Sequence, residues 1–493
     1  MSEIEIHSID SVYVKASCEP SIAQELSDYF TFKVPGAEFT PSYRNKMWDG
    51  RIRLYNQHSQ RIYAGLVPYI HLFAEERDYK VVNHATKKLN VEESELRDYI
   101  EELKLSVSGK EIEPHEHQFD AIQHALSNRR TLLLSPTASG KSLIIYALMR
   151  RWLDENPDEK LLIIVPTISL VSQLYSDFED YSGLSNWNVP DNVHQIFGGQ
   201  DKNTHKSVVI STWQSIYKQP KKYFEQFSAV IGDECHQFKS QSLTNIMTKL
   251  TDCDFRVGLT GTLDGTKTHK LVIEGLFGST HRVVSTKQLM DKDLLSKLKI
   301  DCIQLKYDDQ TCKECKKLKY SEEVDYLVSN PKRNDFIARL AKHAKGNSLV
   351  LFNFVEKHGK PLFELIKKNC PNHSVVYVSG ETPVEEREAI RKQAEKENNI
   401  IIVASYGTFS TGINIRRLHN VIFASPSKSR IRILQSIGRQ LRKSEHKEVA
   451  KLYDIADDLS WKSHKNYTLR HFLERIRIYN EEKFSYKMVS IKT

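Results

Sequence analysis

LLLSPTASGKSLII, residues 132–145, is the stretch that best predicts the fold of this 493-residue chain. Its leading leucines are typical of the end of a buried strand, and the residues after Lys141 have the apolar spacing of a helix. Small residues between a strand and a helix can close their backbone N–H groups around a polyphosphate, where the helix dipole favours negative charge. We therefore predict a phosphate-binding loop made of Ser135, Pro136, Thr137, Ala138, Ser139, Gly140, Lys141 and Ser142.

Two side chains at the end of this loop suit a nucleoside triphosphate. Lys141 can lie on the outer phosphates, and the Ser142 hydroxyl can ligate Mg²⁺. The usual motif begins with glycine, but this chain has Ser135 there, so an ordinary helix N-terminus capped by Ser139 is the alternative. Upstream, Gln118 is expected about one turn ahead of a helix, with an amide that can pair with the donor and the acceptor of an adenine edge.

Strands and helices alternate after the loop, which predicts an α/β domain with a mostly parallel sheet over residues 106–295. In such sheets ligands bind beyond the carboxyl ends of the strands, and Thr167 and Thr212 follow apolar runs at such ends. A further strand ends in Thr260, Gly261 and Thr262, which are suited to linking a site at this edge to a moving partner.

The sequence AVIGDECH places two carboxylates at the same predicted edge of the sheet. Asp233 would hold Mg²⁺ directly or through water, and Glu234 would orient and deprotonate the water that attacks the γ-phosphate. His236 could then report the presence of phosphate to the rest of the protein. Acidic pairs are common at strand ends, so this pair takes its meaning from the phosphate loop that precedes it.

A second α/β pattern extends over residues 296–460. After the apolar run IIIVASY, hydroxyls and backbone donors suited to a phosphate backbone are offered by Thr408, Ser410, Thr411 and Gly412. The helix RIRILQSIGRQLRK carries Gln435, with Arg439 and Arg442 three residues apart on one face. Two arginines held in this way can reach a γ-phosphate from across a domain interface.

The N-terminal residues 1–105 predict a small, separate α/β domain in which acidic side chains outnumber basic ones. Residues 43–63 are an exception, because basic side chains alternate there with aromatic ones; the basic stripe contains Arg44, Lys46, Trp48, Arg51 and Arg53. Such side chains can neutralise phosphates and stack on bases. The alternative is a solvated hairpin whose Trp48 and tyrosines are core residues. At the other end, residues 461–493 are expected to be a helical tail packed on the second domain.

The composition predicts a cytoplasmic protein of about three domains. Charged residues make up 27% of the chain and hydrophobic residues 40%, as in ordinary globular proteins. No apolar run approaches the roughly 20 residues that a bilayer requires, and the N-terminus lacks the regions of a signal peptide, so no membrane partner is expected. The net charge of +8 fits a polyanionic partner. Cys312 and Cys315 have the spacing of one half of a zinc site, without a second such pair nearby. They are expected to be free thiols on a helix.

The sequences PTASGKS, IVPTISL, STWQS, DECH and LTGT occur in this order and resemble the first half of a superfamily 2 DExH helicase, while QSIGRQLR resembles that family's arginine motif. Over nearly the full chain, the sequence is similar to the phage recombination and repair helicases of that superfamily. The resemblance implies an α/β protein with two RecA-like parallel-sheet lobes after an N-terminal DNA-binding domain. It also implies ATP and Mg²⁺ as cofactors, nucleotide contacts at Gly412, Asn414 and Gln435, and DNA contacts at Thr167, Thr212, Thr408 and Thr411. Many relatives have an acid where this chain has Asn414.

The function implied by this resemblance is that of an ATP-dependent DNA helicase that remodels branched DNA in recombination, repair and replication. Its activities would be fork regression, Holliday-junction branch migration and R-loop unwinding. The expected partners are branched, duplex and single-stranded DNA and RNA–DNA hybrids, bound by a monomeric motor in the cytoplasm of a host cell. Two alternatives stay open: an RNA-directed ATP-dependent remodeller, and a nucleic-acid-binding or annealing protein that uses ATP only as a switch.

Overall fold

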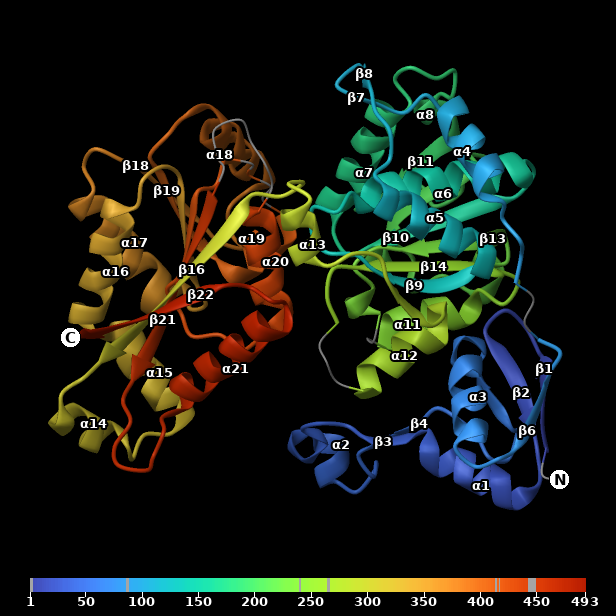
Figure 1. The fold of residues 1–493 in the computed structure, drawn as a ribbon, viewed down its shortest axis with the longest axis horizontal. Coiled ribbons are helices and arrows are strands. Elements are labelled where there is room, and N and C mark those ends of the chain that lie inside the picture. The colour runs from blue at the N-terminus through green and yellow to red at the C-terminus, as the bar shows by residue number, and fades with distance from the viewer. Residues whose placement is uncertain are drawn as a thin grey trace. The chain divides into compact units, whose positions relative to one another are not determined.

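The computed structural model describes residues 3–85, 88–238, 241–263, 267–412, 415, 417–441 and 449–493 (Figure 1). The chain divides into two compact units, one comprising Met1–Ser135 and Ser139–Val283 and the other Pro136–Ala138 and Val284–Thr493. No helix within the described ranges is long and apolar enough to cross a membrane. The fold is the predicted one, with two parallel α/β sheets preceded by a small α/β domain.

The N-terminal domain is a four-stranded sheet in the order β5-β2-β1-β6, covered by two helices. The first fifteen or so residues alternate like one strand, but the structure breaks them into a hairpin, because the Asp10 Oδ1 atom accepts hydrogen bonds from the N–H groups of Val12 and Tyr13 at 2.7 and 2.8 Å. The elements are β1 (Glu3–Ser8), β2 (Tyr13–Ser17), α1 (Pro20–Tyr29), β5 (Arg61–Tyr63), α3 (Val67–Glu75) and β6 (Lys80–Asn83).

An arm, residues 31–53, extends from this domain away from the four-stranded sheet (Figure 1). Its base is a two-stranded antiparallel sheet of β3 (Thr31–Lys33) and β4 (Arg51–Arg53). Its far end contains a short 3₁₀ helix (Ala37–Phe39) and α2 (Pro41–Arg44). The arm contains every residue of the predicted basic stripe, from Arg44 to Arg53.

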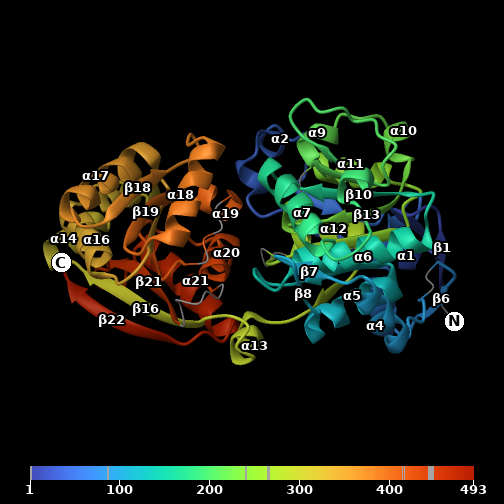
Figure 2. The ribbon, with the colours of Figure 1, turned by 90° about the horizontal axis from the view of Figure 1, so that it is seen from above.

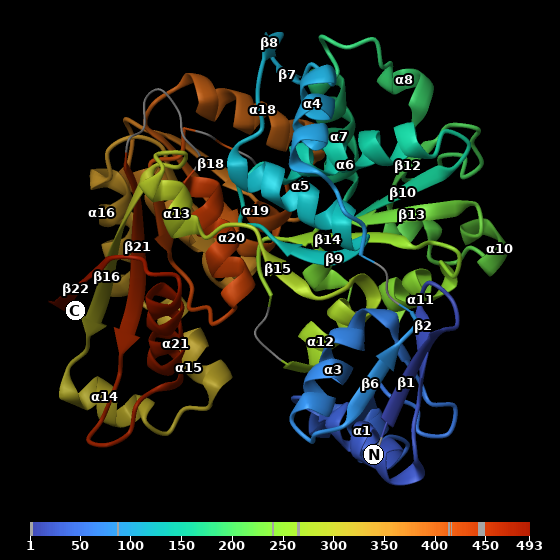
Figure 3. The ribbon, with the colours of Figure 1, turned by 45° about the vertical axis from the view of Figure 1, so that its right-hand side comes forward.

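The first parallel sheet has seven strands in the order β11-β12-β10-β13-β14-β9-β15, and every neighbouring pair is parallel. Alternate residues of β10 face two different cores, so helices cover both faces of the sheet. Figure 3 shows α5, α6 and α7 on one face and α11 and α12 on the other. The strands are β9 (Arg130–Leu134), β10 (Lys160–Val165), β11 (Val193–Ile196), β12 (Val208–Thr212), β13 (Phe227–Gly232), β14 (Phe255–Thr260) and β15 (Thr280–Arg282). The helices are α5 (Glu116–Asn128), α6 (Lys141–Glu155), α7 (Ile168–Tyr181), α8 (Val189–Asn192), α9 (Trp213–Ile216), α10 (Lys221–Phe224), α11 (Gln241–Lys249) and α12 (Lys267–Phe277).

Between the N-terminal domain and this sheet, the chain forms α4 (Glu93–Glu102) and a small hairpin of β7 (Ser106–Val107) and β8 (Lys110–Glu111). Ser106 Oγ donates to the Asp180 carbonyl at 2.5 Å, so the hairpin is fixed to the end of α7.

The second parallel sheet also has seven strands, in the order β18-β19-β17-β20-β21-β16-β22. Helices α16 and α17 pack on one face, and α20 and α21 lie on the other (Figure 1). The strands are β16 (Lys297–Lys306), β17 (Ser348–Phe352), β18 (Ser374–Val378), β19 (Ile400–Ser405), β20 (Asn420–Phe423), β21 (Val449–Asp458) and β22 (Tyr486–Lys492). The helices are α13 (Thr286–Asp291), α14 (Asp309–Cys315), α15 (Tyr320–Ser329), α16 (Pro331–His343), α17 (Lys360–Asn369), α18 (Val384–Lys396), α19 (Tyr406–Gly412), α20 (Arg430–Gln440) and α21 (Tyr467–Glu481).

The C-terminal residues differ from the expected helical tail, because α21 is followed by a strand. β22 pairs in parallel with β16 and forms the edge of the second sheet (Figure 2). The buried Glu323 carboxylate accepts the first N–H groups of α21, from Tyr467 at 2.9 Å and Thr468 at 2.8 Å. The tail is thus part of the second unit's fold. In α14, Cys312 and Cys315 are free and buried.

Candidate nucleotide site and nucleic-acid interface

The predicted phosphate loop connects β9 to α6. Gly140 is the N-cap of α6 in the left-handed region, with φ of 81°, and a Cβ there would lie 2.0 Å from Nε2 of Gln118. Only glycine fits this position without displacing Gln118. The alternative of a helix capped by Ser139 is wrong, because α6 has no side-chain cap and the Ser139 hydroxyl instead hydrogen-bonds that of Ser135 at 2.5 Å. A long helix that begins without a cap leaves N–H groups suited to an anion.

Gln118 lies inside α5, at its third residue, rather than a turn ahead of a helix. Its Oε1 accepts from the N–H of His115 at 2.8 Å, and its Nε2 donates to the Ser139 carbonyl at 3.1 Å. The amide therefore holds both the start of α5 and the phosphate loop. Its pairing with adenine stays a prediction.

The fold brings Lys141 and Glu234 together from distant parts of the sequence. Lys141 Nζ lies 3.9 Å from Oε1 of Glu234 and 3.4 Å from the Ser135 carbonyl. Glu234 has a left-handed backbone, with φ of 50°, two residues after the end of β13. A non-glycine residue in that region is strained, and such strain concentrates at functional sites. No feature of the sequence predicts this conformation.

Asp233 is buried beside Glu234, and its Oδ1 accepts the Glu234 N–H at 2.8 Å. Burial and the neighbouring Glu234 carboxylate raise the pKa of Asp233 to about 6, which nearby Lys141 only partly offsets. A buried carboxylate of this kind is suited to hold a dication, and the Ser142 hydroxyl is a second oxygen donor of the type that Mg²⁺ prefers. The residues present therefore fit the ion.

This raised pKa gives a prediction for the protein without nucleotide and metal. The folded state binds the Asp233 proton more tightly than the unfolded chain, so ionising this carboxylate lowers stability as the pH rises from about 4 to 6. We expect Asp233→Asn to raise the thermal unfolding midpoint at pH 8 and this gain to shrink as the pH falls to 4.5. The exposed Asp252→Asn is the matched control. An equal gain at both pH values would contradict the prediction.

The predicted coupling residues are joined to Glu234 by a short polar chain. His236 Nδ1 lies 3.4 Å from Oε2 of Glu234 and 3.2 Å from Oγ1 of Thr260. The Thr260 hydroxyl donates to the Thr262 carbonyl at 2.9 Å, and Gly261 lies between these two threonines. The end of β14 is thus linked through His236 to the predicted catalytic carboxylate.

The predicted contacts with DNA in the two parallel sheets lie at the strand ends expected for them. Thr167 is the N-cap of α7 and accepts the N–H of Leu170 at 3.4 Å. Thr212 and Thr408 are buried, and their hydroxyls pair with those of Ser215 at 2.8 Å and Ser405 at 2.7 Å. Their contact with DNA stays a prediction.

The remaining predicted residues belong to the second unit. Gln435 is buried in α20, and the Arg439 guanidinium lies 5.8 Å from the centre of the Phe409 ring. Thr411 and Gly412 are the last residues of α19. Asn414 and Arg442 lie outside the described residues.

The arm exposes the basic side chains of Arg44, Lys46, Arg51 and Arg53. Trp48 is only half-buried, and its Nε1 donates to the Arg51 carbonyl at 2.8 Å. Two apolar side chains of the arm are far more exposed: Phe39 at 71% and Met47 at 81%. Their hydrophobic character alone predicts burial, so their exposure could not be predicted from the sequence. The alternative that the aromatic residues of this stretch are core residues holds for Tyr55, which is 1% exposed, but not for the residues of the arm.

The N-terminal domain is joined to the first parallel sheet within one unit. The Ser11 carbonyl accepts hydrogen bonds from Nη2 of Arg130 at 2.5 Å and from Nη1 of Arg256 at 2.9 Å. The Tyr69 hydroxyl donates to Glu274 at 2.7 Å. Gly65 approaches the backbone of α12 so closely that a Cβ there would lie 2.0 Å from the Glu274 carbonyl oxygen. These contacts fix the arm's domain to the unit that carries Lys141 and Glu234.

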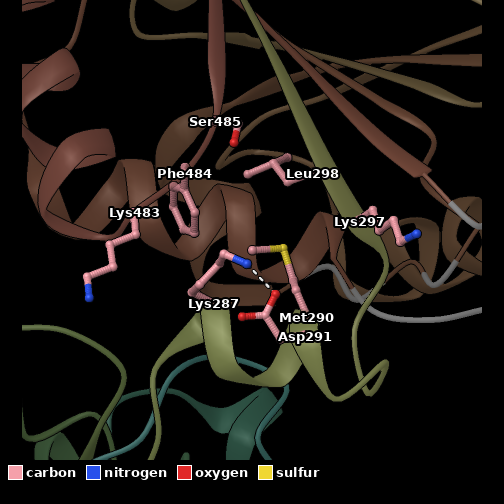
Figure 4. A pocket seen from close by; sticks show the side chains of 8 residues that line it. All are labelled: Lys287, Met290, Asp291, Lys297, Leu298, Lys483, Phe484 and Ser485. Carbon is pink, nitrogen blue, oxygen red and sulfur yellow. Dashed lines mark hydrogen bonds and ion pairs between the residues drawn. The ribbon is translucent and has the colours of Figure 1, made fainter.

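Two hollows lie apart from the predicted site residues. One of about 1100 Å³ is lined by the N-terminal domain and the sheet it packs on. The other, of about 350 Å³, lies in the second unit (Figure 4). Its lining includes the apolar side chains of Met290, Leu298 and Phe484 and the ion pair of Lys287 with Asp291. None of the predicted site residues lines either hollow.

Comparison with known proteins matches three family models to the chain. They are the type III restriction enzyme res subunit over residues 111–265, the N-terminal domain of the DNA helicase UvsW over residues 3–83, and the helicase conserved C-terminal domain over residues 331–444. Among curated proteins, the chain is 38% identical to the ATP-dependent DNA helicase uvsW of Enterobacteria phage T4, covering 99% of each chain. It is 23% identical to the DNA 3'-5' translocase XPB2 of Sulfurisphaera tokodaii, covering 73% of this chain and 84% of that protein. The crystal structure of T4 UvsW matches with a TM-score of 0.54 and 36% identity, over 99% of each chain.

Proposed function

This chain belongs to the UvsW family of ATP-dependent DNA helicases, and we propose that it remodels branched DNA in recombination, repair and replication. The activities proposed are fork regression, Holliday-junction branch migration and R-loop unwinding. The substrates would be branched, duplex and single-stranded DNA and RNA–DNA hybrids, and the motor would act as a monomer. The observation that carries the proposal is that the exposed basic arm belongs to a domain fixed, through Ser11, to the unit holding Lys141 and Glu234.

The ATP site would work through side chains of both units. Lys141 binds the outer phosphates, and Glu234 orients the attacking water and takes its proton as the bond between the β- and γ-phosphates breaks. Ser142 and Asp233 would hold Mg²⁺, which neutralises charge on the phosphates when bound. Arg439 and Arg442 would stabilise the charge that develops on the γ-phosphate once ATP brings the units together.

The arm would supply contacts to the DNA beyond the motor. Arg44, Lys46, Arg51 and Arg53 would neutralise phosphates, while Phe39 and Met47 offer apolar surface for unstacked bases at a branch. Because the arm's domain is fixed to the first parallel sheet, a movement of that unit during hydrolysis would carry the arm and its DNA along. The chain from Glu234 through His236 to Thr260 would pass the state of the phosphate to the DNA-facing edge.

Loss of the arm's charges is expected to separate DNA binding from the ATP site. Replacing Arg51 and Arg53 by alanine should weaken binding to a four-way junction by about tenfold. The slope of the logarithm of the binding constant against the logarithm of the salt concentration should fall by the equivalent of about two phosphate contacts. ATP hydrolysis without DNA should be unchanged, because neither residue contacts the phosphate loop. The measurements are fluorescence anisotropy over a range of salt concentrations and steady-state hydrolysis, with the exposed Lys15→Ala of β2 as the matched control.

The same assay decides between the proposal and its alternatives when single-stranded DNA, duplex DNA, a four-way junction and RNA are compared as activators of ATP hydrolysis. The proposal predicts the largest stimulation by the junction and its reduction in the double variant. Stimulation by RNA alone would support the RNA-directed alternative. Hydrolysis that no polymer stimulates would support the alternative in which ATP is only a switch. An unchanged binding curve for the double variant would leave the arm as ordinary solvated surface.

A further inference from the structure

We infer that Tyr181, a residue outside all of the recognised motifs, positions the hydroxyl of Ser142 for Mg²⁺. The inference rests on the proposed role of Ser142 as a metal ligand. Tyr181 is the last residue of α7, and its hydroxyl lies 2.8 Å from Oγ of Ser142 in the first turn of α6. Among the described residues, no other side chain or backbone group hydrogen-bonds the Ser142 hydroxyl.

The Tyr181 ring is held in place by its surroundings. It packs against the ring of Tyr146, which is fully buried in α6, with 5.6 Å between ring centres. The preceding residue, Asp180, is fixed to the β7–β8 hairpin, because its carbonyl accepts from Oγ of Ser106 at 2.5 Å and its carboxylate accepts from the N–H of Ser108 at 2.6 Å. The end of α7 is therefore held by contacts with α6 and with the β7–β8 hairpin.

The chemistry of a serine hydroxyl explains what such a partner does. The hydroxyl has one hydrogen to donate and two lone pairs to offer. When Ser142 donates its hydrogen to Tyr181, both lone pairs stay free for a cation, and a bound cation makes the hydroxyl a stronger donor. Partners that orient metal ligands in this way typically contribute 10- to 100-fold to metal affinity. Tyr181 is thus a positioning residue, which acts on the metal through Ser142.

The test measures binding rather than hydrolysis. A fluorescent ADP is titrated into the full-length protein at a series of Mg²⁺ concentrations and also in EDTA. Tyr181→Phe keeps the ring against Tyr146 and removes only the hydroxyl. We expect this variant to need about tenfold more Mg²⁺ for half of the metal-dependent gain in ADP affinity, with unchanged ADP binding in EDTA.

Two further variants make the result specific. Tyr175→Phe, on the same helix, removes a hydroxyl that has no hydrogen-bond partner among the described residues and should behave as wild type. In a Ser142→Ala background, Tyr181→Phe should add nothing, because the hydroxyl on which it acts is gone. Additive effects of the two substitutions would overturn the inference.

The Ser142→Ala variant also separates the inference from the proposal on which it rests. If Ser142→Ala leaves the Mg²⁺ requirement unchanged, the proposed metal role of Ser142 is wrong and the inference is overturned with it. If Ser142→Ala raises the requirement and Tyr181→Phe does not, only the inference on Tyr181 is overturned. Thermal unfolding midpoints within about 2 °C of wild type establish that each variant is folded.

Discussion

Replacing Glu234 by glutamine is expected to lower DNA-stimulated ATP hydrolysis by two to four orders of magnitude while ATP still binds. Glutamine has the same shape but cannot take a proton from water at neutral pH. The contacts of Lys141 with the Ser135 carbonyl do not involve the carboxylate, so the phosphate loop should keep its form. The substitution changes the carboxylate that lies beside both Lys141 and His236.

The experiment compares kcat and nucleotide affinity in wild type, Glu234→Gln and Glu225→Gln. Glu225 is an exposed acid on the same unit, and its replacement should leave both quantities unchanged. A second readout follows from the carboxylate pair: because the Glu234 charge contributes to the raised pKa of Asp233, that pKa should fall in Glu234→Gln. Hydrolysis retained within about fivefold of wild type would mean that another group takes the proton.

Replacing Arg475 by leucine is expected to cost the second unit about 3–5 kcal/mol of stability. Arg475 and Asp454 are 2% and 0% exposed, and the guanidinium bonds both carboxylate oxygens at 2.7–3.0 Å. Arg475 also donates to the Ser427 carbonyl at 2.8 Å, which ties α21 to the chain just before α20. With leucine at this position, the buried Asp454 carboxylate keeps, among the described residues, only the Tyr479 hydroxyl, 2.7 Å away, as a side-chain partner.

Hydrogen exchange of peptides from α21 and β21 is the appropriate measurement, because the chain has two units and global unfolding mixes them. Arg477→Leu is the matched control, since Arg477 lies on the same helix and is 73% exposed. Asp454→Leu combined with Arg475→Leu should recover most of the loss, because the cost of the single variant is that of an unpaired buried charge. Protection equal to that of Arg477→Leu in the single variant would contradict the prediction.

The likeness to the UvsW family extends to the arm's domain. ATP hydrolysis and the recognition of nucleic acid can therefore both be tested in this protein. Variants of the phosphate loop and of Glu234 address hydrolysis, and variants of the arm address the choice of nucleic acid. A junction-specific loss in the arm variants, with hydrolysis intact, would place substrate selection outside the motor.

The α/β class, and the strand ends at which the predicted site residues lie, could be predicted from the sequence. A strand buried on both faces is a continuous apolar run, and the first polar residues after it lie at the edge of the sheet, so Ser135, Asp233 and Thr260 could be placed without coordinates. The phosphate loop was predictable for a similar reason, since a strand, small residues and a helix follow one another along the chain.

Which distant segments meet could not be predicted, because it depends on packing in three dimensions. Gln118 holds the phosphate loop, Tyr181 pairs with Ser142, and β22 closes the edge of the second sheet beside β16. The exposure of Phe39 and Met47 could not be predicted either, because the local sequence around an apolar residue does not show whether it lies on an arm or in a core. Period and composition report the shape of one segment, whereas these features depend on the free energy of packing one segment against another.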